Sequence, residues 1–390
     1  MSVTAPKGFR AAGVSAGLKA SGGPDVALVV NDGPDSTAAG VFTANKVKAA
    51  PVLWSQQVLR AGIVRAVVLN SGGANACTGP QGFQDTHATA EFVAAKLTAA
   101  SARLVVGAAD VAVCSTGLIG ERLPMAKLLG GVEAAVRGLN RGGGPDAATA
   151  IMTTDTRAKT SAIAGEGWTV GGMAKGSGML APNLATMLCL LTTDAVADAS
   201  TLDSALRRAT AVTFDRVDSD GCQSTNDTVL LLASGASGIS PTVEELTEAV
   251  TAACHDLALQ LLADAEGSTK DVAVEVRAAA SEEDALEVGR SVARSNLVKT
   301  ALYGADPNWG RILSAVGTTG ADLVPDEVSV AVNGVWVCRG GAAAEDRSKV
   351  DLSGRAVHIL IDLGAGEQTA TIWTNDLSVA YVHENSAYST

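Results

Sequence analysis

The segment with the clearest chemical potential is a glycine-rich turn that leads into an apolar run, GMAKGSGMLAPNLATMLCLL (172–191). Thr186 lies where the apolar run begins, and its hydroxyl would become a nucleophile if a base removed its proton. The simpler interpretation is a Gly/Pro loop that enters a buried strand, with Thr186 as an ordinary β-branched strand residue. The local pattern alone favours this simpler interpretation.

Other patterns that look like catalytic or binding motifs lack the context that such motifs need. GVSAG (13–17) fits the G-x-S-x-G nucleophile elbow, but no convincing strand precedes it. Lys175-Gly176-Ser177 is similar to the end of a phosphate-binding loop, but Ala174 stands where that motif requires glycine. The 4 histidines lie far apart and have no metal-ligand spacing, so the sequence predicts no metal and no cofactor.

Charge and composition exclude several classes of partner. The formal net charge is −12, and no dense Lys/Arg stripe offsets it, which argues against nucleic acid and anionic membranes as partners. The N-terminus has no apolar signal region, and no run is long and apolar enough to span a bilayer. The 6 scattered cysteines contain no C-x-x-C pair and are interpreted as reduced thiols. We therefore expect a cytoplasmic protein.

The elements around these residues indicate a tightly packed α/β protein, because 47% of the residues are hydrophobic but only 3% are aromatic. Asn333-Gly334 separates two apolar runs in 328–338 and predicts a hairpin. RGGGPDAA (141–148) is typical of a surface loop. Apolar runs predict strands at 66–70, 104–107, 228–234, 356–364 and 369–373.

A helix is predicted to begin at Thr242, which forms a T-x-x-E capping box with Glu245. Apolar residues then recur at helical spacing until Gly267, a plausible C-terminal cap. Glu266 would lie at the negative end of this helix, where a carboxylate is mildly unfavourable. The ordinary interpretation is that Glu266 is solvated or paired with Lys270.

Several long motifs identify a family to which the whole chain is similar. In order they are NSGGANACTG (70–79), STGLIG (115–120), IMTTDT (151–156), DSDGCQSTNDT (218–228), LVKTALYGADPNWGRI (297–312) and YVHENSAYST (381–390). Together with the glycine-rich segment, they resemble the ornithine acetyltransferases, the glutamate N-acetyltransferases of arginine biosynthesis often called ArgJ. The resemblance extends from GFRAAGVSAGLK (8–19) to the C-terminus.

The resemblance implies a mixed-sheet, layered α/β sandwich that cuts itself between Ala185 and Thr186. The products would be an α chain, 1–185, and a β chain, 186–390, assembled as α2β2. The cut would give Thr186 an α-amine, whose ordinary pKa of about 7.7–8.0 suits a general base.

The implied reaction moves the acetyl group of N2-acetylornithine to glutamate through an acetyl-Thr186 intermediate, giving ornithine and N-acetylglutamate. Some family members also use acetyl-CoA as the donor, and the sequence leaves this choice open. The implied oxyanion hole is Thr116 and Gly117, where glycine permits close approach of the backbone. Gly73 departs from the asparagine that the family pattern leads us to expect.

The resemblance also implies substrate contacts on both chains. Lys175 is a sensible partner for a substrate carboxylate, and Glu266 for the ammonium group of ornithine. Thr154 is an alternative to its neighbour Thr153, because the register is ambiguous there. The implied substrate-binding residues are Thr153, Lys175, Thr186, Glu266, Asn385 and Thr390.

Two other interpretations remain open. One is an N-terminal-nucleophile amidase or aminopeptidase, which would also cut itself but would use water as the acyl acceptor. The other is an uncut scaffold or binding protein, which would remain one chain and transfer no acetyl group. Glutamate-dependent turnover and the chain mass separate the three interpretations.

Overall fold

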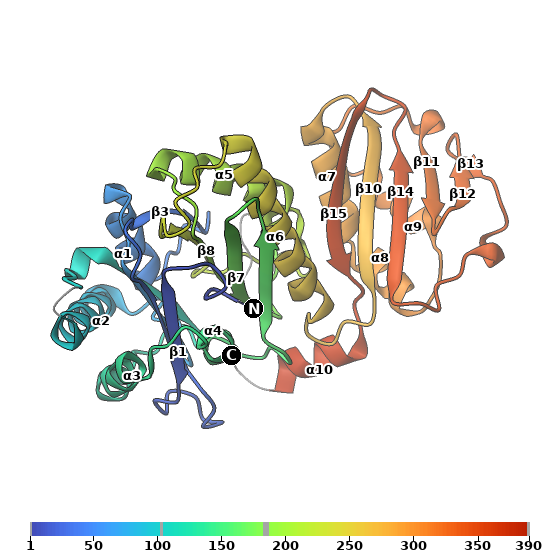
Figure 1. The fold of residues 1–390 in the computed structure, drawn as a ribbon. Coiled ribbons are helices and arrows are strands. Elements are labelled where there is room, and N and C mark those ends of the chain that lie inside the picture. Colours follow the sequence, from blue (N-terminus) through green and yellow to red (C-terminus); the bar gives the residue numbers. More distant parts are fainter. Residues whose placement is uncertain (1, 102–103, 182–186, 388–390) are drawn as a thin grey trace. The chain divides into compact units, whose positions relative to one another are not determined.

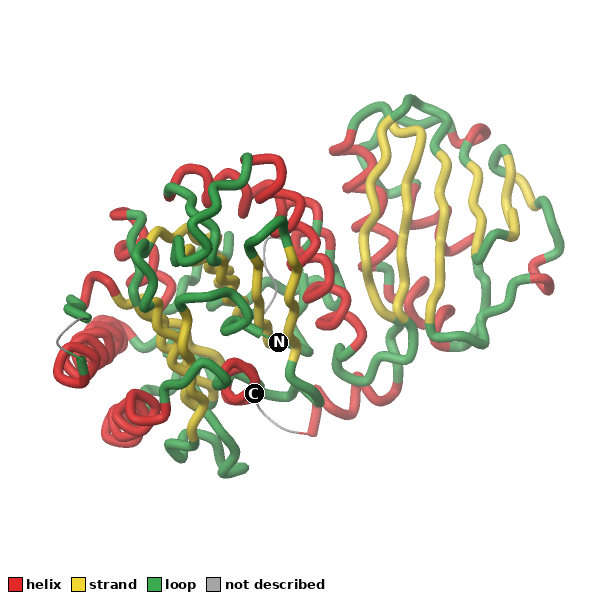
Figure 2. Tube along the Cα trace, viewed as in Figure 1, coloured by secondary structure: helices red, strands yellow, loops and turns green. Residues whose placement is uncertain are grey.

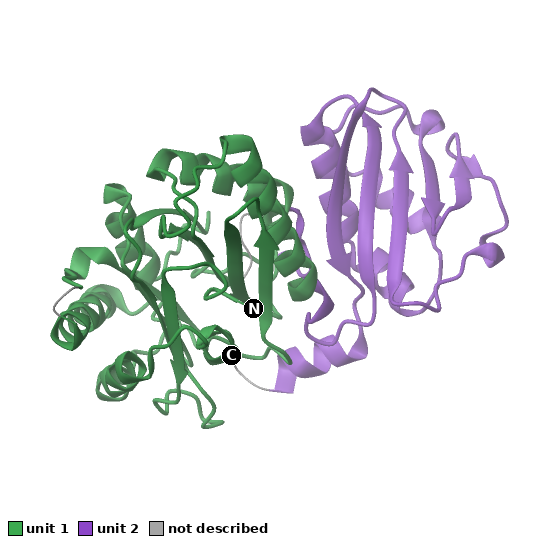
Figure 3. Cartoon of the chain, viewed as in Figure 1, with its two compact units in different colours: residues 1–215, 222–261, 390 green, residues 216–221, 262–389 purple. Residues whose placement is uncertain are grey.

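The computed structural model describes residues 2–101, 104–181 and 187–387, which form two compact units (Figure 3). Unit 1 comprises Met1–Asp215 and Cys222–Leu261, and unit 2 comprises Arg216–Gly221 and Leu262–Ser389. The division differs from the expected cut at Ala185–Thr186, which falls within unit 1. The cut therefore does not separate domains, and its existence remains a prediction.

The first sheet of unit 1 has the strand order β1-β2-β4-β5. Its strands are β1 (Phe9–Val14), β2 (Val26–Asn31), β4 (Ala66–Ser71) and β5 (Val111–Thr116). β4 and β5 are parallel, while the other neighbours are antiparallel. α2 (Gly79–Ala100) and α3 (Met125–Gly138) pack on one face through an apolar cluster that includes Val68, Val93 and Val132.

The second sheet of unit 1 has the order β3-β9-β8-β7-β6. Its strands are β3 (Thr37–Phe42), β6 (Lys159–Ala164), β7 (Thr169–Lys175), β8 (Leu188–Thr193) and β9 (Thr228–Ala233). β8 runs parallel to β9 and antiparallel to β7. α5 (Ala199–Val212) contacts β3 and β9, and Leu257 of α6 (Val243–Ala263) lies against Gly172 of β7.

A shared core joins the two sheets. It includes Leu69 and Cys114 from the first sheet and Leu190 and Leu230 from the second. Every residue of β4, β5, β8 and β9 is buried, because each sheet is covered on both faces. Unit 1 is thus a sandwich of two mixed sheets with helices outside (Figures 1 and 2), and the predicted fold class is confirmed. Unit 1 also contains two shorter helices, α1 (Ala50–Val58) and α4 (Gly144–Ala150).

Unit 2 is a single sheet with helices packed on one face (Figure 1). The strand order is β13-β12-β11-β14-β10-β15. Buried and partly exposed residues alternate along β10 up to Arg277, so one face meets the core and the other does not. The strands are β10 (Asp271–Ala279), β11 (Ser329–Val332), β12 (Val335–Arg339), β13 (Ala342–Ala343), β14 (Ala356–Asp362) and β15 (Gln368–Asn375). The helices are α7 (Glu282–Arg294), α8 (Asn296–Tyr303), α9 (Trp309–Val316) and α10 (Val379–Ala387).

Most of the predicted elements are confirmed. The strands expected at 66–70, 228–234, 356–364 and 369–373 correspond to β4, β9, β14 and β15. Asn333 and Gly334 form the hairpin turn with φ angles of 46° and 84°, the left-handed values that a type I′ turn requires. Thr242 and Glu245 exchange the two hydrogen bonds of the capping box at the start of α6.

Three local predictions are wrong. Residues 104–107 form no strand, and β5 begins only at Val111. The segment is not a buried strand because Val105 is 74% exposed. Within 141–148, α4 begins at Gly144, since Pro145 is well suited to the first turn of a helix. α6 ends at Ala263, so Gly267, although its φ is 62°, lies in the following turn and does not cap the helix.

No helix in the described ranges is both long and apolar enough to cross a membrane.

Candidate active site

Thr116 and Gly117 lie where β5 ends, against the loop that follows β4. The N–H of Gly73 donates to the carbonyl of Thr116 at 3.0 Å, and the N–H of Ala74 donates to Leu118 at 2.9 Å. A Cβ on Gly117 would lie 2.5 Å from the nitrogen of Gly73 and 2.8 Å from the carbonyl carbon of Gly72. Only glycine fits there, and its φ of 127° is one that residues with a side chain rarely adopt. Gly73 stands where the family pattern has asparagine, but it contacts Thr116 through its backbone N–H, so this contact does not depend on the side chain.

Lys175, on the second sheet, lies beside the loop that contains Thr116 and Gly117. It ends β7, is only 2% exposed, and its ammonium donates to the Thr116 hydroxyl at 3.4 Å. A buried ammonium is stable only with polar or charged partners. The structure therefore brings Lys175 and Thr116 together within unit 1.

Asp155 provides the negative charge beside this lysine. Its Oδ1 accepts from Lys159 Nζ at 2.6 Å and from the N–H of Gly176 at 2.7 Å. Burial would raise the pKa of Asp155, but the charges of Lys175 and Lys159 and these hydrogen bonds lower it to about 2. The carboxylate is thus ionised at all physiological pH values and holds the loop after β7 in place.

Thr153 and Thr154 precede this carboxylate and make different contacts. The N–H of Thr153 donates to Asp155 Oδ2 at 2.9 Å. The hydroxyl of Thr154 is 2.5 Å from that of Ser177, on the loop that follows Lys175. Both threonines are therefore attached to the Lys175 region, and the choice between them as the substrate contact stays a prediction.

Ala185, Thr186 and Thr390 lie outside the described residues. The described chain resumes at Met187, whose N–H donates to Oδ1 of Asp227 at 3.0 Å. The carbonyl of Met187 accepts from the N–H of Thr228 at 3.1 Å, so this residue is held on both sides. Leu188 pairs with Lys175 on one side and with Thr228 on the other, which places the start of β8 beside Lys175.

Unit 2 brings together Glu266 and Asn385. Asn385 Nδ2, on α10, donates to Glu266 Oε2 at 3.0 Å. The proposed pairing of Glu266 with Lys270 is wrong, because the Lys270 ammonium donates instead to the carbonyls of Leu352 and Gly354 at 2.5 and 2.7 Å.

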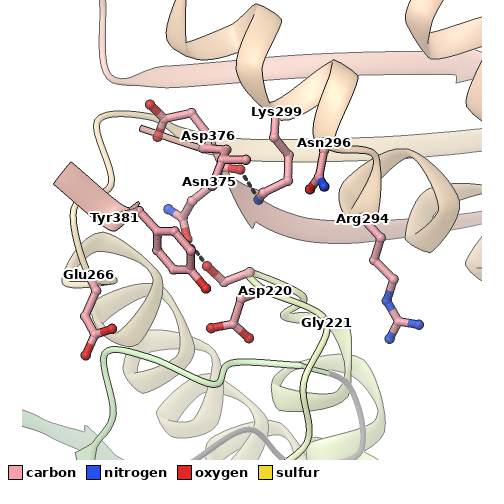
Figure 4. A pocket seen from close by; sticks show the side chains of 11 residues that line it. Asp220, Gly221, Glu266, Arg294, Asn296, Lys299, Asn375, Asp376 and Tyr381 are labelled. Carbon is pink, nitrogen blue, oxygen red and sulfur yellow. Dashed lines mark hydrogen bonds between the residues drawn. The ribbon is translucent and has the colours of Figure 1, made fainter. Parts of the chain in front are cut away.

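Glu266 lines a cavity of about 160 Å³ in unit 2 (Figure 4). Asp220, Asp376 and Tyr381 line the same cavity, together with Lys299 and Arg294. Arg294 is paired with Asp218 at 2.7 Å. Burial lowers the pKa of Lys299 to about 8, against the opposing effect of Asp220, Asp218 and Asp376, and its ammonium donates to Thr374 Oγ1 at 3.0 Å. The lining thus contains three acidic side chains, Asp220, Glu266 and Asp376, and two basic ones.

Sequence reasoning missed the two buried carboxylates of the site, Asp155 and Asp227. Both stand inside quoted motifs, IMTTDT and DSDGCQSTNDT, and for Asp227 the available signal was an acid directly before the apolar run 228–234. It also missed Asn226, whose side-chain amide donates to the carbonyls of Ala74 and Ser115 at 2.7 and 2.8 Å. These bonds link the segment before β9 to the Thr116–Gly117 loop.

Comparison with known proteins decides the family. The ArgJ family model matches residues 10–390. The chain belongs to the ArgJ family. This confirms the resemblance inferred from the motifs and, with it, the expectation of an enzyme.

Relatives of the ArgJ family match along the entire chain. The arginine biosynthesis bifunctional protein ArgJ of Streptomyces avermitilis is 66% identical over 389 residues, covering 100% of both chains. The protein of the same name from Thermobifida fusca is 62% identical over 390 residues, again over 100% of both chains. That of Mycobacterium tuberculosis is 62% identical, covering 99% of this chain and 96% of its own.

Solved structures were also matched. A chain of ornithine acetyltransferase from Mycobacterium tuberculosis, crystallised with ornithine, is 66% identical, covers 46% of this chain and 94% of its own, and has a TM-score of 0.45. An ArgJ protein from Bacillus halodurans is 35% identical, covers 50% of this chain and 97% of its own, and has a TM-score of 0.49.

Proposed function

We propose that this protein is an ornithine acetyltransferase that cuts itself between Ala185 and Thr186 and then uses Thr186 as its nucleophile. The observation that carries the proposal is the meeting of three strand ends in unit 1. Gly117 follows β5, Lys175 ends β7, and Met187, the residue after Thr186, precedes β8. Membership of the ArgJ family and the bifunctional ArgJ relatives support it.

Cleavage supplies the base that the hydroxyl lacks. In this scheme the Thr186 hydroxyl attacks the carbonyl of Ala185, the C–N bond breaks with the proton passing to the departing amine, and water hydrolyses the resulting ester. Thr186 then carries both a hydroxyl and a free α-amine. In each later turnover the α-amine removes the proton of the hydroxyl.

Acetyl transfer proceeds in two halves. The Thr186 oxygen attacks the acetyl carbonyl of N2-acetylornithine, and the resulting oxyanion is stabilised at Thr116 and Gly117. The C–N bond of the substrate breaks, the proton held by the α-amine passes to the leaving nitrogen, and ornithine departs. The amine of glutamate then attacks acetyl-Thr186, releasing N-acetylglutamate and regenerating the free hydroxyl.

Fixed charges orient the two substrates. Both carry an α-carboxylate, which we assign to the Lys175 ammonium beside Thr116, with Thr153 as a further contact. The ammonium of ornithine is assigned to the Glu266 carboxylate, which the Asn385 amide contacts. Thr390 is assigned to the same substrate site.

Two extensions belong to the proposal. The relatives are named bifunctional, which supports acetyl-CoA as a second acetyl donor for glutamate. The two chains would remain joined by the five-stranded sheet, because β3, β6 and β7 come from 1–185 and β8 and β9 from 186–390. Two such cut protomers would form the α2β2 assembly.

The alternative is a self-cutting amidase that uses water as the acceptor. One assay separates the functions: purified protein is incubated with N2-acetylornithine, with and without glutamate, and ornithine, acetate and N-acetylglutamate are measured. We expect ornithine and N-acetylglutamate in equal amounts and little acetate. Acetate in place of N-acetylglutamate would identify the hydrolase, and no reaction in a chain of intact mass would identify the scaffold.

A further inference from the structure

A single side-chain amide, that of Asn226, holds the segments on both sides of the contact between Thr116 and the loop after β4. Asn226 lies two residues before β9 and is buried. Its Nδ2 donates to the carbonyl of Ser115, on β5, at 2.8 Å and to the carbonyl of Ala74, in the loop after β4, at 2.7 Å. Ser115 and Ala74 are buried as well, and a buried carbonyl needs a hydrogen-bond partner.

The orientation of this amide is itself fixed. Its Oδ1 accepts from the hydroxyl of Thr225 at 2.6 Å, while its nitrogen faces the two carbonyls. Only the NH₂ group can donate to two carbonyls, so the opposite orientation of the amide would lose these bonds. The backbone of Asn226 is also held, because its N–H donates to Ser224 Oγ at 3.1 Å and its carbonyl accepts from the Thr228 hydroxyl at 2.9 Å.

The direction of the Gly117 N–H follows from the peptide group that contains it. The carbonyl of this group is that of Thr116, which accepts the N–H of Gly73 at 3.0 Å. The described residues contain no cis peptide bond, and in a trans peptide the C=O and the N–H point in opposite directions. The Gly117 N–H therefore points away from Gly73. No described residue accepts a hydrogen bond from it, so it can donate to a substrate oxygen.

Asn226 fixes the peptide groups on both sides of Thr116. The peptide between Ser115 and Thr116 cannot rotate without breaking the bond from the amide to the Ser115 carbonyl. The peptide after Thr116 is anchored by Gly73, and the bond from the amide to Ala74 holds the residue that follows this anchor. Loss of the amide would thus allow both peptide groups to rotate.

We propose that Asn226 is a positioning residue for the oxyanion hole: by holding Ser115 and Ala74 it aims the N–H of Gly117 at the carbonyl oxygen of the bound acetyl group. This inference rests on the proposed function, because it requires an oxyanion that forms beside Gly117. A donor stabilises the transition state most when it is aimed before the reaction begins. The proposed substrate contacts do not include Asn226, so its loss should lower kcat and leave both KM values nearly unchanged.

Asn226→Ala and Asn226→Asp remove the two bonds to different extents. Alanine removes both, whereas the carboxyl in Asn226→Asp, kept protonated by burial beside two carbonyl oxygens, can donate one. We expect kcat to fall by roughly 10- to 100-fold in Asn226→Ala and by less in Asn226→Asp, as for a catalytic group that is displaced slightly. Unchanged kcat in the cut alanine variant, or a rise in KM without loss of kcat, would overturn the proposal.

The two half-reactions give a sharper form of the same measurement. The same oxyanion position serves attack on N2-acetylornithine and attack of glutamate on the acetyl-enzyme. Release of ornithine and formation of N-acetylglutamate, each followed in a single turnover, should therefore slow by similar factors in Asn226→Ala. A defect confined to one half-reaction would indicate a substrate contact instead and would also overturn the positioning role.

Asn31→Ala is the matched control. Asn31 ends β2, is buried, and its Nδ2 donates at 3.0 Å to the carbonyl of Ala233, which ends β9. It is therefore another buried amide that joins the two sheets of unit 1 through β9, at the opposite end of that strand. Its loss should lower stability but not kcat. Equal losses of kcat in Asn31→Ala and Asn226→Ala would show a general loosening of the sandwich and not an aimed donor.

Amide hydrogen exchange gives a measurement that needs neither cleavage nor substrate. Peptides that cover 115–120 should take up deuterium faster in Asn226→Ala than in the wild type, and at the wild-type rate in Asn31→Ala. Unchanged exchange at 115–120 in Asn226→Ala would overturn the proposal even if this variant is not cut.

A milder variant covers failure of both Asn226 variants to fold. Thr225→Val removes only the hydroxyl that orients the Asn226 amide and keeps the shape of the side chain. It should lower kcat less than Asn226→Ala and speed exchange at 115–120, and a variant with neither effect would overturn the proposal. The transfer assay on the wild-type protein, run first, shows separately whether the proposed function has failed.

Discussion

The ammonium of Lys175 lies 3.4 Å from the hydroxyl of Thr116, and this contact joins the ends of β7 and β5 across the two sheets of unit 1. A cation is thereby held beside the loop proposed to stabilise the oxyanion. Because both elements are strands with buried neighbours, the position of the charge is set by the sheets and not by a surface loop.

Lys175→Met should weaken binding of both substrates, since each carries an α-carboxylate. Loss of a charge-assisted hydrogen bond of about 1.5–3 kcal/mol corresponds to roughly a 10- to 100-fold increase in KM. Initial rates against N2-acetylornithine and glutamate provide the measurement. The variant Lys96→Met, which removes a pair with Glu133 at 3.0 Å and a cation–π contact with Phe92 at 5.1 Å, is the control. Unaltered KM values for both substrates would rule out the carboxylate assignment.

Cleavage should depend on the Thr186 side chain. Thr186→Ala lacks the hydroxyl and should remain a single chain without transferase activity, whereas Thr186→Ser keeps a hydroxyl and should cut at least in part. Denatured mass gives the result: two fragments, 1–185 and 186–390, for the wild type and one chain for the alanine variant. A cut and active alanine variant would exclude Thr186 as the nucleophile.

Gly117→Ala should impair catalysis more than folding. The new Cβ would meet the backbone of Gly72 and Gly73 at 2.8 and 2.5 Å, so the loop must move and carry the oxyanion donors with it. Loss of such a donor typically lowers kcat by about 100- to 1,000-fold. Gly120→Ala is the control, because Gly120 has φ of 90° in the same loop but no atom within 4 Å of the added Cβ. Equal kcat losses in the two variants would count against the oxyanion role.

The sequence predicted single elements well where their signals were local, whereas the sandwich itself was implied by the resemblance to the family. The capping box at Thr242 and the turn at Asn333-Gly334 depend on residues within a few positions, and the structure confirms both. Residues 104–107 were misjudged because an apolar run does not reveal exposure, and Val105 is 74% exposed.

The site was harder to predict because its contacts are distant in sequence. Lys175 and Thr116 are 59 positions apart, and Asp227 lies 40 positions from Met187. No spacing rule connects such distant residues. The resemblance to the family was the only reason to predict Lys175 and Thr116 as site residues, and nothing in the sequence predicted Asp227. The Lys270 pairing failed for the same reason, since its true partners are carbonyls at 352 and 354.

Asp155 should make stability depend on pH below about 4. Burial opposes ionisation of Asp155, but the charges of Lys175 and Lys159 together outweigh burial and lower its pKa from 3.8 to about 2. A depressed pKa means that the stabilisation is present above the unfolded value and lost as pH falls through the folded value. It should contribute about 2 kcal/mol at neutral pH.

Urea unfolding of wild type and Asp155→Asn between pH 2 and 7 measures this contribution. The difference in unfolding free energy should shrink as the pH drops from about 4 to 2. Asp203→Asn on α5 removes an exposed pair with Arg207 at 2.8 Å and should change stability by less than about 1 kcal/mol. A difference independent of pH would show that Asp155 is not the group that titrates.

Glu266→Gln should act mainly on the donor substrate. Glutamine keeps an acceptor for the Asn385 amide, now 3.0 Å from Glu266 Oε2, but it removes the charge that would attract the ornithine ammonium. We expect KM for N2-acetylornithine to rise by roughly 10-fold, as for loss of about 1.4 kcal/mol, and KM for glutamate to change little. Glu283→Gln, in the first turn of α7, is the control for loss of one charge from unit 2. If KM for glutamate rises instead, the ammonium belongs elsewhere and Glu266 orients the acceptor; if neither KM moves, Glu266 does not contact the substrates.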